Sequence, residues 1–256
     1  NSSYILSSQK TNALTGGTYT FWEFYKGKEL GEIWGYETDG YYTVDDFVDT
    51  SSWKLKDGVP SIDGYNPRPG DVKYLDVNGD GIVDSNDEVA IGYSSIPEIV
   101  YGFGTQLMWK GFDVGIFFRG QTRVSYMLGG EGFVPFQEGG DRGNLFVEAL
   151  DRWTVDNPRQ DAFYPRLSIG GSTNNYQEST KWQVDGSFLR LADLEIGYSF
   201  PKKWLEPMFL SGLRIYFHGT NLAVFSPFKM WDPEIGNSGA RYPINATWTF
   251  GLDVTF

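Results

Sequence analysis

The last ten residues alternate strictly between apolar and polar positions. Every even position from Trp248 to Phe256 is apolar, and every odd position from Thr247 to Thr255 is polar or glycine. Successive side chains of a β-strand point to opposite faces, so this segment predicts a strand with one fully apolar face. Comparable period-2 patterns, weakest in the first, predict further strands. The six expected strands are residues 18–25, 99–109, 111–123, 193–200, 213–222 and 247–256.

The connections between these expected strands alternate between short and long. Lys110 and Gly111 form one tight turn, and a modest turn containing Pro201 follows residue 200, whereas about residues 28–96, 124–185 and 223–245 form long connections. Outer-membrane β-barrels combine short periplasmic turns with long extracellular loops. The pattern therefore predicts part of an all-β transmembrane barrel whose last strand ends at the periplasmic side at Phe256. A soluble β-sandwich also alternates, but it rarely needs connections this long.

Composition agrees with a β-rich chain. Aromatic residues make up 17% and there are 32 glycines, an enrichment typical of strands and turns. No run of 18 apolar residues occurs, which excludes a transmembrane helix but not a barrel. Six strands cannot close a barrel, and each unpaired backbone group at an edge costs several kcal/mol in hydrocarbon. Further strands are therefore expected from the rest of the barrel.

Charge and residue content exclude several functions. The net charge of -12 argues against a nucleic-acid partner, and the absence of cysteine removes disulfides, thiolate metal sites and cysteine nucleophiles. Residues 1–5 do not resemble a signal peptide, so an export signal would lie upstream. The only histidine, His218, is expected on the polar face of a strand as a hydrogen-bonding group. No catalytic motif occurs and no carboxylate pair stands out, so we expect no enzyme, and an acidic surface hydrolase is only a remote alternative.

Residues 76–87 match the spacing of a calcium-binding loop. Gly81 stands where such a loop turns sharply, and Asp87 replaces the glutamate that usually closes the site. A structural Ca²⁺ that holds a long loop is the expected role, and an acidic turn that binds nothing is the alternative. The expected ligands are Asp76, Asn78, Asp80, Ile82 through its carbonyl, Asp84 and Asp87.

Three tryptophans fall in the long connections: Trp53, Trp182 and Trp231. Exposed aromatic rings can stack on sugars, so these residues are candidate ligand contacts. Packing within the loops or against a partner is the favoured alternative.

The same segments resemble the C-terminal region of the SusC/RagA family of TonB-dependent outer-membrane transporters, from about Leu30 to Phe256. Gly251, Val254 and Phe256 also resemble the terminal signal read by the barrel-assembly machinery. The order and spacing of several short motifs carry the resemblance. These motifs are residues 35–40, 70–74, 76–87, 109–113, 188–191, 221–222, 232–234, 242–243 and 249–256.

The resemblance implies a barrel of about 22 strands with an N-terminal plug, in contact with membrane lipid in the outer membrane of a Gram-negative bacterium. It also implies import of oligosaccharides or peptides, driven through TonB and aided by a SusD-like surface lipoprotein. No plug is recognisable here, so residues 1–256 are expected to be the C-terminal part of the barrel. A soluble, calcium-stabilised carbohydrate-binding β-module is the alternative, and the direction in which Trp248 to Phe256 face distinguishes the two.

Overall fold

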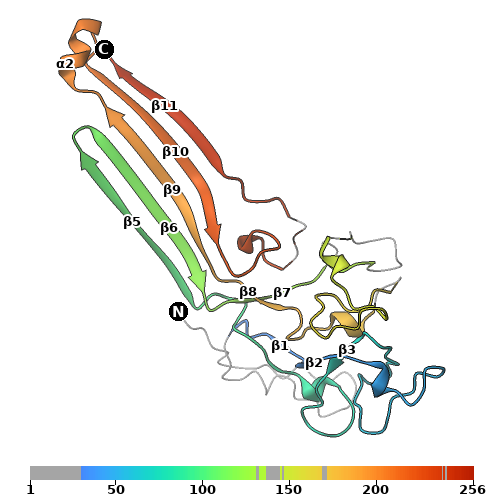
Figure 1. Ribbon diagram of the computed structural model, residues 1–256. Helices are drawn as coiled ribbons and strands as arrows, with labels where there is room; N and C mark the ends of the chain where they lie inside the picture. Colours follow the sequence, from blue (N-terminus) through green and yellow to red (C-terminus); the bar gives the residue numbers. More distant parts are fainter. Residues whose placement is uncertain are drawn as a thin grey trace.

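The computed structural model describes residues 30–130, 133–136, 145, 147–168, 172–237, 239 and 241–256. It consists of a long, curved sheet with a cluster of folded loops at one end (Figure 1). The described residues form strands, short 3-10 helices and one α-helix, α2 (Lys202–Leu205). No helix in this part of the chain is long and apolar enough to cross a membrane. The fold class is therefore all-β, as the sequence predicts.

The main sheet has five antiparallel strands in the order β11-β10-β9-β6-β5. Strands that follow one another along the chain are thus neighbours in the sheet. The expected sixth strand, residues 18–25, lies outside the described residues. The five strands are β5 (Ile99–Trp109), β6 (Phe112–Thr122), β9 (Phe188–Ser199), β10 (Gly212–Phe225) and β11 (Thr247–Thr255).

Two short turns join these strands at the end of the sheet away from the loops (Figure 1). Trp109 pairs with Phe112 across a two-residue turn. Lys110 and Gly111 both have positive φ, 49° and 91°, which matches the twist of a type I′ hairpin turn. The second turn, between β9 and β10, contains α2 and the 3-10 helix η5 (Glu206–Met208).

Strands β9 and β10 begin or end beyond their predicted bounds. β9 starts at Phe188 rather than residue 193, and β10 runs to Phe225 rather than residue 222. The register shifts beside Phe117 and Phe118, where Ala192 is an extra residue, and again between Thr220 and Ala223. A bulge changes which sequence positions face each side. A strict period of two therefore stops at each bulge although the strand continues.

One face of the sheet is apolar and uncovered. Trp248, Phe250 and Leu252 of β11 expose 67%, 81% and 61% of their surface. The opposite face carries most of the charged side chains of the strands. Phe117, an apolar exception on that face, lies against glycines of β5: a Cβ added to Gly102 would be 3.1 Å from its ring.

The two longest connections are folded rather than irregular. The described residues within 30–96 and 124–187, here called the loop unit, contain two hydrophobic cores, one around Val72, Tyr74 and Trp153 and one around Phe133 and Trp182. Its strands are β1 (Trp34–Gly35), β2 (Thr38–Tyr41), β3 (Val72–Tyr74), β4 (Val89–Ala90), β7 (Ser125–Met127) and β8 (Gln183–Asp185). Its 3-10 helices are η1 (Val44–Asp46), η2 (Ser85–Asp87), η3 (Val147–Leu150) and η4 (Asn174–Tyr176).

A buried carboxylate links the two halves of the loop unit. Asp71 is fully buried and accepts hydrogen bonds from Arg166 Nε at 2.7 Å and Asn175 Nδ2 at 2.9 Å. Tyr65 adds a third bond through its hydroxyl at 3.1 Å. Buried charges persist in proteins only when paired and hydrogen-bonded. The first and second long connections therefore depend on each other for their folding.

Candidate functional site

The polar face of the sheet carries a cluster of charges near the short turns. Arg214 on β10 donates to Asp113 on β6 at 2.5 Å and to Glu195 on β9 at 2.6 Å. His218, four residues further along β10, lies 3.4 Å from Asp193. His218 thus occupies the polar face, as predicted. The charges pair across neighbouring strands, which fits a wetted surface better than a protein core.

The third long connection folds back onto this polar face at the opposite end of the strands. Arg190 of β9 donates two hydrogen bonds of 2.6 Å to Asp232, and its Nε lies 2.7 Å from Glu234. Arg119 of β6 donates to the same Glu234 at 2.6 Å and 3.0 Å. Asp232 also caps η6 (Pro233–Ile235) by accepting from the backbone of Glu234. These ion pairs fix the connection against the inner side of the sheet.

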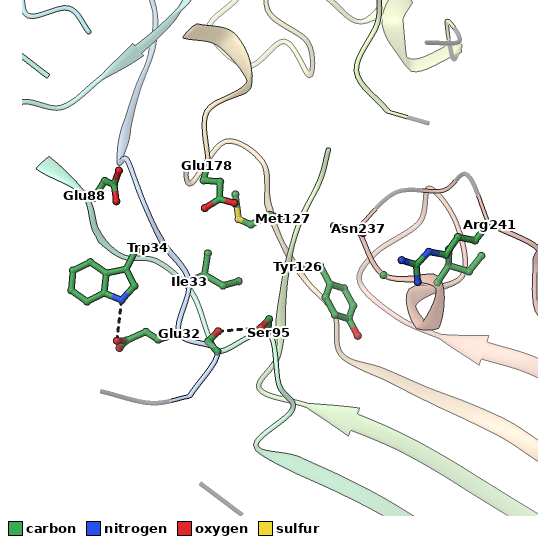
Figure 2. A pocket seen from close by; sticks show the side chains of 13 residues that line it. Glu32, Ile33, Trp34, Glu88, Ser95, Tyr126, Met127, Glu178, Asn237 and Arg241 are labelled. Atoms are coloured by element: carbon green, nitrogen blue, oxygen red, sulfur yellow. Dashed lines mark hydrogen bonds between the residues drawn. The ribbon is translucent and has the colours of Figure 1, made fainter. Parts of the chain in front are cut away.

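A cavity of about 630 Å³ lies where the three long connections meet. Figure 2 shows Trp34, Glu88 and Glu178 from the loop unit on one side, and Arg241 from the third connection on the other. Ile33, Met127 and Ile235 give the lining an apolar part. The full lining is Gly31, Glu32, Ile33, Trp34, Glu88, Ser95, Tyr126, Met127, Glu178, Ile235, Gly236, Asn237 and Arg241.

Hydrogen bonds hold several side chains of this cavity in place. Trp34 Nε1 donates to Glu32 at 3.2 Å (Figure 2), and the Tyr36 hydroxyl donates to Glu88 at 3.5 Å. Burial raises the pKa of Glu88, and the nearby Glu178 adds to this, although the bond from Tyr36 opposes it. Burial also raises the pKa of Tyr36 to about 12. Tyr36 therefore acts as a donor over the whole physiological pH range.

The predicted calcium loop is closed by hydrogen bonds to the backbone. Asp76 accepts from the N–H groups of residues 79, 80 and 81. Asp87 is fully buried and accepts from those of residues 77, 78 and 84. Among the described residues, no three His, Cys, Asp or Glu side chains gather as a metal site requires. The spacing fits calcium but this side-chain arrangement does not, so calcium binding stays a prediction.

The three candidate tryptophans all contact protein. Trp182 is only 1% exposed and stacks on Tyr176 inside the second core, so it offers no surface for ligand stacking and the favoured alternative, packing within the loops, holds there. The apolar residues around Trp182 come from segments that are far apart in the sequence, so the local pattern does not reveal that this side chain is buried. Trp53 packs edge-on against Phe47, with Arg68 5.9 Å from its ring. Trp231 packs against Phe228 and donates to Gly236 O at 2.8 Å.

Comparison with known proteins shows which proteins the chain is related to. No protein-family profile matches the chain. TonB-dependent receptor P26 of Formosa agariphila is 32% identical over the whole chain. The chain is homologous to the TonB-dependent receptors. TonB-dependent receptor SusC of Bacteroides thetaiotaomicron is 24% identical over 75% of the chain. The chain spans 27% of the length of P26 and 18% of SusC.

Solved structures show the same fold. The RagAB peptide importer in the open-open state matches 90% of the chain with a TM-score of 0.58 and 21% identity. Its closed-closed state matches 91% with a TM-score of 0.60 and 22% identity. The chain covers 23% and 24% of those chains. The five-stranded sheet therefore has the fold of part of these solved chains.

TonB-dependent receptors are β-barrel proteins of the Gram-negative outer membrane, and the homology places this chain in that membrane. They are transporters rather than enzymes. In such a barrel the apolar face of the sheet contacts lipid and the polar face lines the interior. Trp248, Phe250 and Leu252, the uncovered apolar side chains of β11, belong to the face that contacts lipid in such a barrel.

Of the predicted barrel-assembly residues, Gly251 and Val254 lie within β11 and Phe256 directly follows it. Val254 and Phe256 are on the apolar face. Gly251 is on the polar face, where a Cβ would collide with the ring of Tyr216. Gly251 thus has a packing role of its own. The role of the three residues in barrel assembly stays a prediction.

The sequence pattern missed the interior ion pairs and the cavity. Arg190, Asp232 and Glu234 occur in two of the motifs that carry the family resemblance, and their opposite charges were the available signal. The cavity residues gave no such signal because they come from three separate connections. Neither the spacing of Glu32, Glu88 and Glu178 nor their neighbours in sequence links them.

Proposed function

We propose that this chain forms wall strands and outer loops of a TonB-dependent importer of oligosaccharides or peptides. TonB would supply the energy. It would act through parts of the receptor that lie outside the region matched by this chain. A SusD-like surface lipoprotein would cover the loops, and a substrate would pass along the polar face of the sheet. The chain itself would have no catalytic role. The chain is homologous to about a quarter of the length of such a receptor, and the proposal concerns the function of the whole receptor.

The observation that carries the proposal is the opposite chemistry of the two sheet faces. Phe250 and Phe256, 81% and 88% exposed, belong to a face that is unfavourable in water. The Arg214 and Arg190 ion pairs belong to a face that is unfavourable in lipid. A sheet with both properties is stable as a barrel wall between lipid and a water-filled interior.

A soluble carbohydrate-binding β-module fits these faces less well. Such a module would bury the apolar side of its sheet against a second layer. Here Ile99, Phe103 and Leu107 on β5 and Trp248, Phe250 and Leu252 on β11, at the two edges of the sheet, are each at least 45% exposed. The folded loop unit supplies hydrophobic cores of its own, but it lies at the end of the strands and not over this face (Figure 1).

Single-cysteine labelling tests the orientation, because this chain has no cysteine. Lys56→Cys in the loop unit and Lys203→Cys in α2 both replace exposed lysines. In a cysteine-free version of the complete receptor, a membrane-impermeant maleimide should label residue 56 on intact cells. Residue 203 should react only after the outer membrane is permeabilised. Equal labelling of both positions on intact cells would contradict the proposed topology.

Uptake measurements test the transport role. Cells that depend on the complete receptor should lose uptake of its nutrient when either the receptor gene or tonB is deleted. The receptor should also co-purify with a surface lipoprotein. Uptake that continues at the same rate without TonB would overturn the proposed function.

We also propose that residues 76–87 bind Ca²⁺ as a structural ion, on the strength of the sequence spacing alone. Binding requires Asp76 and Asp87 to turn from backbone N–H groups toward a shared centre. Millimolar Ca²⁺ should then raise the melting temperature of the loop unit, since a ligand that binds only the folded form stabilises it. The increase should disappear in Asp80→Ala, whose side chain is exposed. An unchanged melting temperature in wild-type protein would refute calcium binding.

A further inference from the structure

The turn between β9 and β10 carries large apolar side chains on its outer side. Leu205 of α2 is buried, whereas Trp204, Met208 and Phe209 are 58%, 61% and 91% exposed. This turn lies at the end of the sheet away from the loop unit, so the loop unit does not cover it (Figure 1). Exposed apolar side chains that gather in one place mark a contact with a partner or a membrane. The turn therefore indicates an apolar environment outside the described part of the chain.

The backbone at Phe209 supports the same conclusion. Its φ of 58° is left-handed, and its N–H donates to Glu206 O at 3.2 Å to end η5. Glycine is the usual residue at such a position, because a bulky side chain there is strained. Strain of this kind persists mainly where a residue has a function. Since Phe209 is so exposed, little packing within the chain offsets the strain, which points to a contact with something else.

A series of rings connects this turn to the apolar face of the sheet. The ring centroids of Phe112 and Tyr198, paired on β6 and β9, are 4.5 Å apart. Tyr198 is 5.0 Å from Phe200, and Phe200 is 6.3 Å from Trp204. In a TonB-dependent receptor barrel the apolar face contacts lipid. Trp204 thus continues the lipid-contacting surface beyond the ends of the strands.

Lysines accompany the rings at this end of the sheet. Lys202 and Lys203 are exposed on α2, and Lys110 of the tight turn is exposed with its Nζ 4.8 Å from the ring of Trp109. The two turns are adjacent, because the N–H of residue 199 donates to the carbonyl of residue 111 at 2.7 Å. Glu206 is the only acidic residue in residues 110–111 and 201–211, although the whole chain has a net charge of -12. Lysines beside aromatic rings are typical of protein surfaces at the level of lipid headgroups.

We propose that this end of the sheet binds the phosphate headgroups of anionic phospholipids in the periplasmic leaflet. The three lysines would contact the phosphates, and the three exposed apolar side chains of the turn would insert beside them. Segments that lie in a membrane interface combine apolar and basic side chains in this way. This rests on the proposed function, which places the short turns at the periplasmic side. The β9–β10 turn is then a membrane anchor as well as a connection.

Native mass spectrometry of the complete receptor in detergent tests the choice of lipid. The probes are phosphatidylglycerol, which is anionic, and phosphatidylethanolamine, which is zwitterionic. A lysine near an anionic lipid surface contributes roughly a fivefold preference, so the receptor should bind phosphatidylglycerol about fivefold or more tighter. Equal binding of the two lipids by the wild-type receptor would overturn the proposal.

Two sets of lysine substitutions locate the binding. The preference should be lost in the combined variant Lys110→Gln, Lys202→Gln and Lys203→Gln. It should persist in a control that replaces three exposed lysines of the long connections, Lys54→Gln, Lys56→Gln and Lys229→Gln. An unchanged preference in the first variant would show that the short turns do not bind the headgroups.

Fluorescence quenching tests whether the turn enters the membrane. A fluorophore is attached to Met208→Cys in a cysteine-free version of the complete receptor, in vesicles that contain a lipid spin-labelled at its headgroup. Its emission should be quenched strongly, whereas the same fluorophore at Lys56→Cys should be quenched little. Equally weak quenching at both positions would mean that the turn stands in water or is covered by protein, and would overturn the proposal.

The lipid contact and the transport role fail in different ways. If uptake needs TonB but phosphatidylglycerol is not preferred, the lipid contact is wrong and the importer stands. If uptake does not need TonB, the proposed function fails regardless of which lipid the turn binds.

Discussion

Arg190 illustrates how a single side chain can position a whole connection. It is only 2% exposed and contacts both Asp232 and Glu234. Removing one partner of a buried ion pair leaves the other charge buried without compensation. This costs more than replacing both partners by apolar side chains. The third connection therefore depends on this side chain for its place on the inner side of the wall.

Arg190→Ala should destabilise the attachment of residues 226–246 by about 3–5 kcal/mol. Proteinase K should then cut that connection faster, as measured by fragment sizes over time. Arg190→Lys should give an intermediate result, because an ammonium group cannot contact two carboxylates with the planar fork of arginine. Lys203→Ala, an exposed change outside the connection, is the control. Equal cutting rates for Arg190→Ala and the control would contradict this role.

Asp87 has a structural role that does not require a metal. Its buried carboxylate accepts three backbone N–H bonds of 2.8, 3.1 and 2.9 Å. Asp87→Ala should cost about 1–3 kcal/mol and speed hydrogen exchange at residues 77, 78 and 84, even in EDTA. Asp57→Ala, at an exposed position, is the matched control. Unchanged exchange at those three amides in EDTA would show that the bonds do not hold the loop.

At the scale of elements, strands β5 and β6 could be predicted closely from the sequence because no bulge interrupts their register and Phe117 is the one exception to the pattern of β6. β9 could be predicted only in part. The residues of β9 that point to the apolar face are odd-numbered before Ala192 and even-numbered after it, because the bulge adds one residue there. A pattern of period two cannot reveal such a change without the neighbouring strand. The small strands of the loop unit were also missed, because strands of two to four residues are too short to show a period.

The two faces of β11 predict opposite responses to the same substitution. Phe250→Arg places a charge in lipid and should cost about 2–4 kcal/mol near the middle of the membrane. Thr249→Arg places it on the water-filled side and should cost much less. Folded barrels appear as heat-modifiable bands in gels. The amount of this band for each variant receptor measures how much the two substitutions differ in cost. Equal folding of the two variants would mean that the faces are assigned wrongly.

The tyrosines of the loop unit predict how its stability changes at high pH. Burial raises the pKa of Tyr36 to about 12 and raises the pKa of Tyr41 and Tyr42 further. Unfolded tyrosines ionise near pH 10. Above that pH the folded unit keeps protons that the unfolded chain releases, so its stability falls as pH rises. The melting temperature can be followed by near-ultraviolet circular dichroism. Tyrosine ionisation should not affect it below about pH 9 and should lower it above about pH 10.

Tyr41→Phe provides the check on this mechanism. It removes one titrating group along with a buried bond of 2.8 Å to Ala162 O. The variant should be less stable at pH 7, but its stability should fall less steeply above pH 10. A slope as steep as that of the wild-type protein would exclude Tyr41 as a source of the effect.

At the scale of the whole molecule, the sheet and the loop unit form by different means. Paired backbones and contrasting faces define the sheet, and the sequence pattern predicts its strands except where bulges interrupt them. The loop unit depends on contacts between residues about 100 positions apart, such as Asp71 with Arg166 and Asn175. Contacts of this kind leave no local pattern, which is why the cavity could not be predicted from the sequence.

Asp71→Ala should therefore loosen both halves of the loop unit together. The variant leaves Arg166 and Asn175 without their buried partner and should cost about 3–5 kcal/mol. Hydrogen exchange should accelerate in residues 36–75 and 160–182 at once, while the strands of the sheet stay protected. Asp57→Ala should change neither segment. Faster exchange confined to the first half would show that the halves fold independently.

The type I′ turn at Lys110 and Gly111 determines which insertions and deletions the gene can tolerate. Trp109 pairs directly with Phe112 across it. One codon more or less would shift β5 against β6 by a residue and exchange the two sides of the strand. Phe103 and Leu107 would then enter the aqueous interior. Length changes should therefore be rare at this turn, and natural variation in length should accumulate in the three long connections.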